Sequence, residues 1–280
     1  MNNLITTFIT GNNKLTNLSY TFCGLNNLGT ETLDLSKFSG LNEVTNLHMC
    51  FGGSPIKKIT NIFPEANKLT NVSSLFARTK ITDLPNNIFI NCVNITDAAY
   101  CFYNTKLTSV TNKQIFNSDS DNVDVCGIFK NCKNLTTGAV SFFNLHPKII
   151  IADEAFAYTG LNELQDKNGD NDRYLFDNTI KLSSAKGLFN NCDSLTSLPN
   201  YLKFQSSPAL TTNIDLSGLF FNCTNLEGSI SQTFFTNLKT KIISLGNGLI
   251  RNGEDDNAQC IEVLGAFCNT KIKNYIGMAF

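Results

Sequence analysis

The feature that most constrains the fold is a repeat centred on phenylalanine. Nine Phe residues share a local context in which the residue four positions earlier is apolar and the preceding residue is apolar or small. We call this set the phenylalanine column: Phe22, Phe51, Phe76, Phe102, Phe129, Phe156, Phe189, Phe220 and Phe267. Most spacings lie between 25 and 33 residues, and the longer last gap is expected to hide a degenerate unit centred on Ile250. Units this short cannot each close a core, so neighbouring units must stack.

Each unit contains two segments of predicted regular structure. Positions −4, −1, 0 and +3 relative to the column Phe have the spacing of a two-turn helix, so a short helix or 3₁₀ segment is expected, for example over 72–79. A Thr-rich Leu-x-x-Leu element follows, as in 81–84, and its composition predicts a short strand that ends at a corner. A second set of phenylalanines comes next: Phe63, Phe89, Phe116, Phe142, Phe204, Phe234 and Phe280.

These segments predict one domain over residues 1–280, of the α/β class. The expected architecture is a solenoid of about nine coils, spaced by about 4.8 Å where strands pair directly. A parallel β-sheet is expected on one face, with short helices or 3₁₀ turns on the other.

Two stretches resemble repeats of bacterial surface proteins. Leu188–Pro199 (LFNNCDSLTSLP) is similar to the BspA-like leucine-rich repeat. Leu33–Phe38 (LDLSKF) followed by Val44–Phe51 (VTNLHMCF) resembles the related 26-residue surface-protein repeat of mycoplasmas and lactic bacteria. The resemblance implies a right-handed leucine-rich-repeat solenoid and a place among exported adhesins and surface proteins. It carries no catalytic residues to this chain, because the family motif contains only structural ones.

The repeat departs from its pattern in three places. Residues 166–172 form an insertion, 251–259 are polar and out of register, and Phe8 and Phe280 leave both ends in mid-repeat. Solenoids need polar caps for solubility. We therefore expect either a segment of a longer polypeptide or ends covered by neighbouring subunits, with an uncapped soluble monomer as the alternative.

Charge and hydropathy argue against two classes of partner. The chain has 22 Lys+Arg against 23 Asp+Glu, a net charge of −1, so no global electrostatic attraction to nucleic acid or an acidic membrane surface is expected. No apolar run approaches the about 20 residues that cross a bilayer, which argues against membrane insertion. Residues 1–8 lack the basic and apolar regions of a secretory signal.

The cysteines are predicted to be structural thiols. Cys92, Cys132, Cys192 and Cys223 each stand three residues after a Phe, at a position where other units have Thr. Since Thr cannot replace a disulfide or a metal ligand, small buried side chains are favoured over those two alternatives. The residue two after the Phe is often Asn, and this Asn column is expected to satisfy backbone groups at a corner.

No group of residues points to catalysis. The two histidines, His48 and His146, lie far from any Ser or Cys nucleophile motif. Oxygen ligands alternate as in calcium loops at Asp166, Asn168, Asp170 and Asp172. The Gly is misplaced there and no Glu follows at the twelfth position, so a solvated loop is favoured. We expect no enzyme activity, no cofactor and no metal.

The expected binding surface is the outward face of the Leu-x-x-Leu strands. Its polar positions are Lys58, Asp83, Ser109, Thr137, Glu163, Ser197 and Asn274. Such a surface suits recognition of a protein or glycan through many modest contacts, although each residue could equally be a solvated strand residue. The first functional hypothesis is a non-catalytic adhesion module at the cell surface or outside the cell. The second is a structural or fibre segment of a larger assembly, such as a phage virion.

Overall fold

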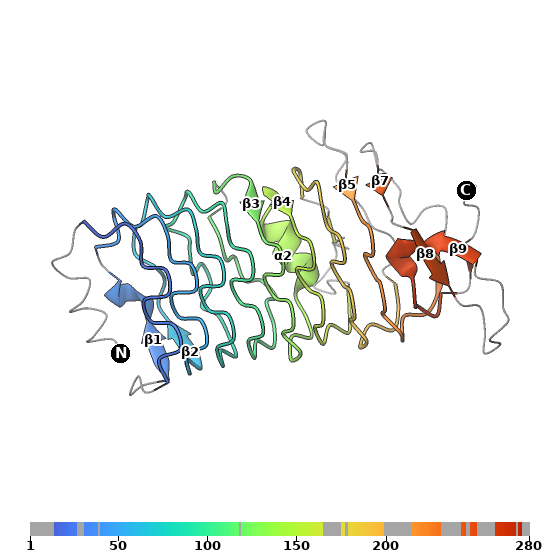
Figure 1. The fold of residues 1–280 in the computed structure, drawn as a ribbon, viewed down its shortest axis with the longest axis horizontal. Coiled ribbons are helices and arrows are strands. Elements are labelled where there is room, and N and C mark those ends of the chain that lie inside the picture. Colours follow the sequence, from blue (N-terminus) through green and yellow to red (C-terminus); the bar gives the residue numbers. More distant parts are fainter. Residues whose placement is uncertain are drawn as a thin grey trace.

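A computed structural model describes most of the chain as a stack of coils. Each coil contains one member of the phenylalanine column and is named after it. Figure 1 shows the coils following one another along the long axis of the molecule. The described residues are 14–26, 31–38, 40–117, 119–164, 175–176, 179–198, 214–230, 242–244, 247–250, 261–272 and 274–275.

The regular elements are short. The strands are β1 (Thr32–Asp34), β2 (Lys58–Thr60), β3 (Val123–Asp124), β4 (Ile149–Ile151), β5 (Ile214–Asp215), β6 (Ser229–Ile230), β7 (Ile242–Ser244), β8 (Asn247–Ile250), β9 (Ile261–Leu264) and β10 (Asn274–Tyr275). The helices are α2 (Ala139–Leu145) and the 3₁₀ turns η1 (Leu35–Lys37) and η2 (Gly265–Phe267). Strands pair in parallel as β1–β2, β3–β4, β5–β7 and β6–β10, whereas β8–β9 is antiparallel. The fold is therefore mixed α/β, with few helices and short parallel strands in the described residues.

The segment around each column Phe forms a ladder of turns between coils. In the Phe76 coil, alternate N–H groups donate to carbonyl oxygens of the Phe102 coil, at N···O distances of 2.7–2.9 Å. The donors are Val72, Ser74, Phe76 and Arg78. The N–H groups between them, those of Leu75, Ala77 and Thr79, donate three residues back within their own coil. We call this stacked surface, from five residues before each column Phe to three after it, the phenylalanine wall.

The prediction of a short helix around each column Phe is wrong, because this segment forms turns, for example over 72–79. Residues two before and two after the column Phe have left-handed backbone angles, as at Tyr100 (φ +57°) and Asn104 (φ +54°), with Gly265 before Phe267 as the exception. Left-handed residues interrupt an α-helix and produce successive turns instead. The Asn column is mainly explained by this angle, which Asn tolerates better than most residues. Asn91 does bond a backbone group as predicted, because its side-chain amide donates to the carbonyl of Phe63 at 3.0 Å.

The N–H three residues before each column Phe takes part in neither hydrogen-bond series. In most coils it donates instead to an Asn or Asp side chain two residues earlier, at 2.8 Å for Ser73 to Asn71 and for Cys126 to Asp124, whereas the N–H of Lys186 donates to Asp153 of the preceding coil. Such turns are a local preference of Asn and Asp. The polar backbone of the wall is thereby paired through most of its length, as a buried surface requires.

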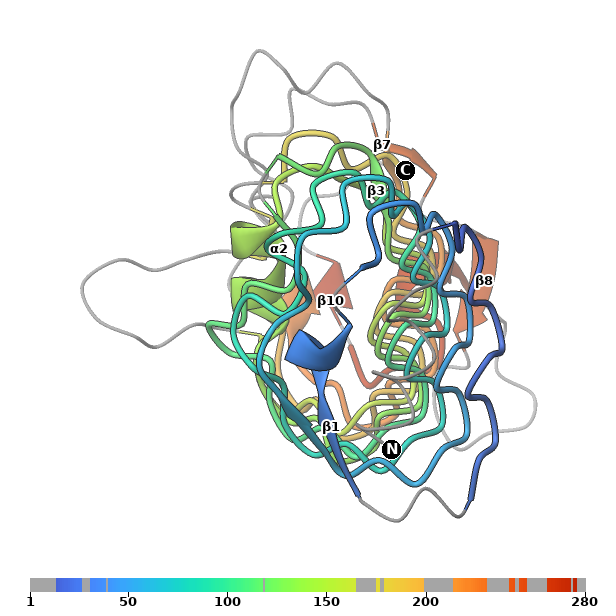
Figure 2. The ribbon, with the colours of Figure 1, turned by 90° about the vertical axis from the view of Figure 1, so that its left-hand side faces the viewer.

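The core consists of stacked phenylalanine rings, with the coils superimposed around it when viewed along the stack (Figure 2). Rings of the phenylalanine column lie 5.2–6.1 Å from the next ring along the whole set. The second set stacks from Phe63 through Phe89 to Phe116, at 5.1 and 5.9 Å. These rings are fully buried, so removal of apolar surface from water drives the stacking.

Helix α2 interrupts the second set. Phe142 packs against Phe129 and Phe156 of the first set, whereas His146 follows Phe116, at a ring distance of 5.5 Å. Phe142 therefore does not stack in the second set, although the sequence predicted that it would, and His146 takes that place. Phe204, Phe234 and Phe280 lie outside the described residues, as do Phe8, the insertion 166–172 and the polar stretch 251–259.

Candidate functional site

The outer surface of the phenylalanine wall changes character along the stack. The position two residues before the column Phe has a left-handed backbone in every coil except the last, where Gly265 begins η2. It is Tyr20, Met49, Ser74 and Tyr100 in the first four coils, then Gly127 and Glu154. It is Gly187, Gly218 and Gly265 in the last three coils. Without side chains at these positions, the wall is hollowed.

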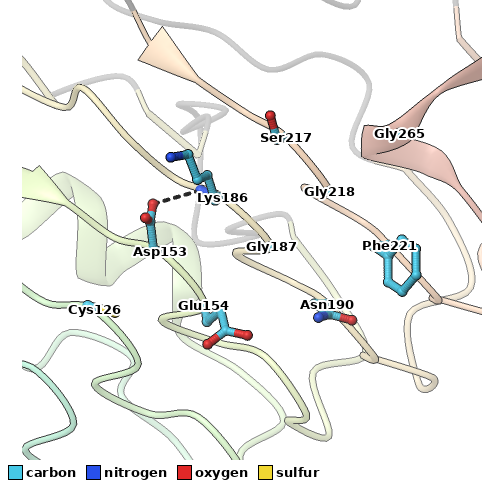
Figure 3. Close-up of a pocket in the computed structure, with 10 residues that line it drawn as sticks. All are labelled: Cys126, Asp153, Glu154, Lys186, Gly187, Asn190, Ser217, Gly218, Phe221 and Gly265. Atoms are coloured by element: carbon cyan, nitrogen blue, oxygen red, sulfur yellow. Dashed lines mark hydrogen bonds between the residues drawn. The ribbon is translucent and has the colours of Figure 1, made fainter. Parts of the chain in front are cut away.

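The hollow is a groove of about 530 Å³ (Figure 3). Gly187 and Gly218 lie side by side on its floor, since a Cβ atom on Gly218 would come within 3.9 Å of the Gly187 Cα. Glu154 borders the floor on one side, because its Cγ lies 3.5 Å from the position of a Gly187 Cβ. Phe221 borders it on the other. This volume lies within the range of about 300–1,000 Å³ that is typical of ligand-binding pockets.

Charged side chains border the groove and are held by neighbours. Lys130 pairs with Glu154 at 2.5 Å, and the Lys186 ammonium lies 3.4 Å from the Asp215 carboxylate. Asp153 accepts the backbone N–H of Lys186 at 2.8 Å, as Figure 3 shows. Burial opposes ionisation of Asp215, but hydrogen bonds from Ser217 outweigh it and keep the pKa of this carboxyl below its ordinary value.

Two exposed aromatic rings flank the same region. Phe221 is 39% exposed and Tyr158 is 42% exposed, although rings of this size are usually covered. The Lys130 ammonium lies 5.9 Å from the centre of the Tyr158 ring. Tyr158 and Phe221 lie on either side of the Phe189 coil: the Tyr158 N–H donates to Asn190, and the N–H of Asn191 donates to Phe221.

His48 belongs to a hydrogen-bond chain in the first coils of the wall. Its Nδ1 lies 2.8 Å from the Ser73 hydroxyl, and its Nε2 lies 3.0 Å from the Tyr20 hydroxyl. The Ser73 hydroxyl donates to the Asn71 side-chain oxygen at 2.7 Å. Because the Ser73 hydroxyl donates its proton to Asn71, it accepts from His48, so Nδ1 of His48 is the donor. In this arrangement the imidazole does not act as the base for that serine.

His146 is a core residue. Its Nε2 accepts the N–H groups of Ile115 and Phe116 at 2.9 and 3.2 Å, and its Nδ1 lies 2.6 Å from the Phe142 carbonyl. Nδ1 therefore carries the proton. Burial lowers the pKa of His146 to about 4, although the hydrogen bond to Phe142 acts in the opposite direction. The side chain supplies one acceptor, Nε2, for two backbone N–H groups beside α2 that have no carbonyl partner.

The polar positions predicted as the binding surface lie away from this groove, and the prediction that they stand on strands is wrong for all but Lys58 and Asn274. Ser109, Thr137 and Ser197 form only isolated bridges. The segments of Asp83, Ser109, Thr137 and Glu163 follow one another in successive coils, since Thr108 bonds to Thr82, Thr136 to Thr108 and Asn162 to Thr136. Lys58 lies in β2, Ser197 bridges to Glu227, and Asn274 lies in β10 beside Ser229. The hydroxyls of Ser109 and Thr137 bond to each other at 2.9 Å, and Asp83 pairs with Lys113 at 3.2 Å.

The structure brings together no metal site among the residues that it describes. The calcium candidates Asp166, Asn168, Asp170 and Asp172 lie outside those residues. The nine described cysteines are all free thiols.

The groove is a site that the sequence-based prediction missed. Its signal is the Gly found two residues before Phe189, Phe220 and Phe267. That pattern identifies a hollow only once the backbone geometry shows that this position faces outward.

Comparisons of the chain with protein-family models, with curated proteins and with solved structures find no match. Within the described part of the chain, no helix combines the length and apolar character needed to span a membrane.

Proposed function

We propose that this chain is a non-catalytic binding module whose stacked coils form a leucine-rich-repeat type of solenoid. It holds an extended macromolecule, a protein or a glycan, against the outer surface of the phenylalanine wall. The glycine-floored groove at Gly187 and Gly218 carries this proposal, because it is a hollow with polar and aromatic borders on an otherwise regular surface. The resemblance to surface-protein repeats supports adhesion at a bacterial cell surface as the biological setting.

The rigidity of the wall supports binding. Backbone hydrogen bonds join the Phe156 coil to the Phe189 coil and that coil to the Phe220 coil, for example Glu154 N–H to Lys186 at 2.7 Å and Gly187 N–H to Ser217 at 2.8 Å. A preorganised groove loses little conformational entropy when a partner enters. Long stacked surfaces also accumulate affinity from many modest contacts.

The geometry of the histidines supports a non-catalytic role. His146 is buried and holds backbone groups, and His48 donates to Ser73 rather than removing its proton. General-base and nucleophilic catalysis need a base that can accept a proton from the reacting group.

A pair of glycine substitutions tests the proposed groove. Gly218→Asn fills the floor, and its Cβ would meet Phe221 at an ordinary 3.5 Å. Gly53→Asn is the matched control, because Gly53 has nearly the same backbone angle (φ +69° against +66°) and lies in an early coil, where a Cβ atom would have no neighbour nearer than 4.0 Å. Asn tolerates this angle, so both variants should fold.

The two variants are compared for adsorption to bacterial cells, insoluble polysaccharides and immobilised matrix proteins. We expect the unsubstituted chain and Gly53→Asn to bind the same member of the panel, with Gly218→Asn binding it at least about tenfold more weakly. Equal binding by both variants would show that the groove is not the binding site. If the unsubstituted chain binds nothing, the alternative of a structural segment in a larger assembly is favoured.

A further inference from the structure

We propose that the groove binds a neutral polysaccharide with an extended β-1,4-linked backbone, laid along the stack of coils. This inference rests on the proposed binding function and assigns its ligand class. The observation behind it is the placement of aromatic rings on the wall, two coils apart, beside polar side chains that suit sugar hydroxyls.

Three aromatic rings recur at alternate coils of the wall, one or two residues after the column Phe. Tyr103, Tyr158 and Phe221 belong to the Phe102, Phe156 and Phe220 coils, so each ring is two coils from the next. Two coils span about 10 Å when neighbouring backbones are hydrogen-bonded. Sugar rings of an extended β-1,4-linked chain present the same face at each disaccharide, over nearly the same distance. One saccharide chain can therefore stack every second sugar on a ring of the wall.

The rings are held in place before a ligand arrives. The Arg78 guanidinium lies 5.7 Å from the centre of the Tyr103 ring, and the Lys130 ammonium lies 5.9 Å from that of Tyr158. Lys130 is fixed in turn by Glu154. The backbone of Phe221 is held by the hydrogen bond from the N–H of Asn191 to the Phe221 carbonyl. The Tyr103 and Tyr158 rings, each contacted by a cation, provide apolar contact area at a low entropic cost.

The polar border favours a ligand without charge. The two cations beside the groove, Lys130 and Lys186, are already paired with Glu154 and Asp215. An acidic polysaccharide would have to compete with these carboxylates for them. The side chains of Asn190, Glu154 and Lys186 supply amide, carboxylate and ammonium groups that can hydrogen-bond hydroxyls.

Titration calorimetry with a length series tests the inference. The probes are cello-oligosaccharides and chito-oligosaccharides from the disaccharide to the hexasaccharide, which share the β-1,4-linked backbone and differ in the N-acetyl group. A trisaccharide is the shortest probe that can touch both Phe221 and Tyr158. We expect affinity to rise by about tenfold between the disaccharide and the trisaccharide in at least one series. The α-linked malto-oligosaccharides, which curve, should show no such step.

Variants of the two rings separate stacking from general destabilisation. Phe221→Ala should lower trisaccharide affinity about tenfold, and Phe221→Tyr should retain it. In Tyr158→Ala the trisaccharide should bind no more tightly than the disaccharide. Both positions are partly exposed, so circular dichroism and melting should stay close to those of the unsubstituted chain.

Failure of this inference can be told from failure of the proposed function. Absence of binding in both β-linked series, or a length step that persists in Tyr158→Ala, overturns the polysaccharide assignment. If the groove variant Gly218→Asn still loses binding to a protein of the panel, the binding module stands and its ligand is a polypeptide.

Discussion

The Cys192 thiol lies 3.1 Å from the carbonyl oxygen of Phe156 in the preceding coil. The Thr159 hydroxyl lies 2.8 Å from the same oxygen. Cys223 makes the equivalent contact with Phe189 at 3.0 Å, and Cys132 with Phe102 at 3.1 Å. Both groups thus donate hydrogen bonds to the carbonyl groups of column phenylalanines. The Cys thiol reaches the carbonyl of the preceding coil, and the Thr hydroxyl reaches the carbonyl of its own coil. This explains why Cys and Thr alternate at that position of the repeat.

Cys192→Thr should lower the free energy of unfolding by about 1–2 kcal/mol. The new hydroxyl can donate to Phe189 as Thr159 does to Phe156, but the Phe156 carbonyl loses its second donor. Urea denaturation measures the change. A loss of stability as large as that caused by removing a column phenylalanine would show that Cys192 does more than fill space in the core and donate a hydrogen bond.

Reductant should leave the melting temperature of the unsubstituted chain unchanged, because the described cysteines are free. Burial raises the pKa of Cys192 to about 11, so its thiol also stays protonated and unreactive at neutral pH. Rapid labelling of Cys192 in the folded protein would contradict this.

Phe102→Ala should lower the free energy of unfolding by about 3–5 kcal/mol. Phe102 is fully buried between Phe76 and Phe129, at ring distances of 5.7 and 5.8 Å. Its removal leaves a cavity that two fixed rings cannot fill. Tyr158→Ala, on the outer surface of the same wall, is the control and should change stability by less than about 1 kcal/mol. Similar losses for both would mean that the ring stack does not dominate the core.

His146 should make the protein sensitive to acid. Above pH 6.5 the imidazole is neutral in both states, so its contribution is fully present. Between pH 6.5 and about 4 the unfolded chain binds a proton that the folded chain excludes, and stability falls as the pH falls. The loss over this window should be about 3 kcal/mol.

The pH dependence of urea unfolding in a His146 variant isolates this effect. His146→Phe fits the ring column beside Phe116 but leaves two backbone N–H groups without their acceptor, so it should be less stable at pH 7. Its stability should nevertheless vary less between pH 6.5 and 4. Gly53→Ala, which changes no ionisable group, is the control and should keep the slope of the unsubstituted chain. An unchanged slope in His146→Phe would assign the acid sensitivity to other groups.

Gly138→Ala should destabilise the protein by about 3 kcal/mol or more. Gly138 precedes α2 with φ +109°, and a Cβ atom there would lie 2.5 Å from the Thr111 backbone nitrogen. Backbone atoms of a neighbouring coil cannot move aside. Gly53→Ala is the matched control, since its nearest atom would be 4.0 Å away and only the left-handed angle opposes it, at about 1 kcal/mol. Equal losses would show that the backbone near Thr111 can adapt.

The repeat and its buried columns could be predicted because buried positions are occupied by apolar residues at fixed offsets in each unit of the sequence. Every member of the phenylalanine column is in the core, and Phe63, Phe89 and Phe116 stack as a second set. Side chains at fixed offsets from a Phe must face inward if units stack. That inference does not depend on how the backbone turns between them.

The helix could not be predicted correctly from the same apolar stripe. Residues at −4, −1, 0 and +3 face one side in a helix and also in a series of turns closed by bonds to the third residue back. The distinguishing residues are those at +2, such as Gly53, Asn104 and Asn131, which prefer left-handed angles. In the interior of a helix, these Gly and Asn residues would only lower the stability of the helix. At positions with left-handed backbone angles, they favour the turns that form the phenylalanine wall.

The groove was missed for the same reason. In a helix, the residue two before the column Phe would lie on the polar side with no special exposure. In the turn ladder it faces outward, so Gly187 and Gly218 open the surface. The predicted surface, represented by Asp83, Ser109 and Thr137, rested on the assumption that polar strand residues are the available ones.

A crystal structure of the chain with the tightest-binding member of the adsorption panel, or with the hexasaccharide that binds most tightly, tests the central claim directly. The account predicts that the bound molecule lies over Gly187 and Gly218, with Phe221 and Tyr158 in contact with it. A molecule seated instead on the Leu-x-x-Leu face, against Asp83, Ser109 and Thr137, would contradict the account and restore the surface expected from the sequence.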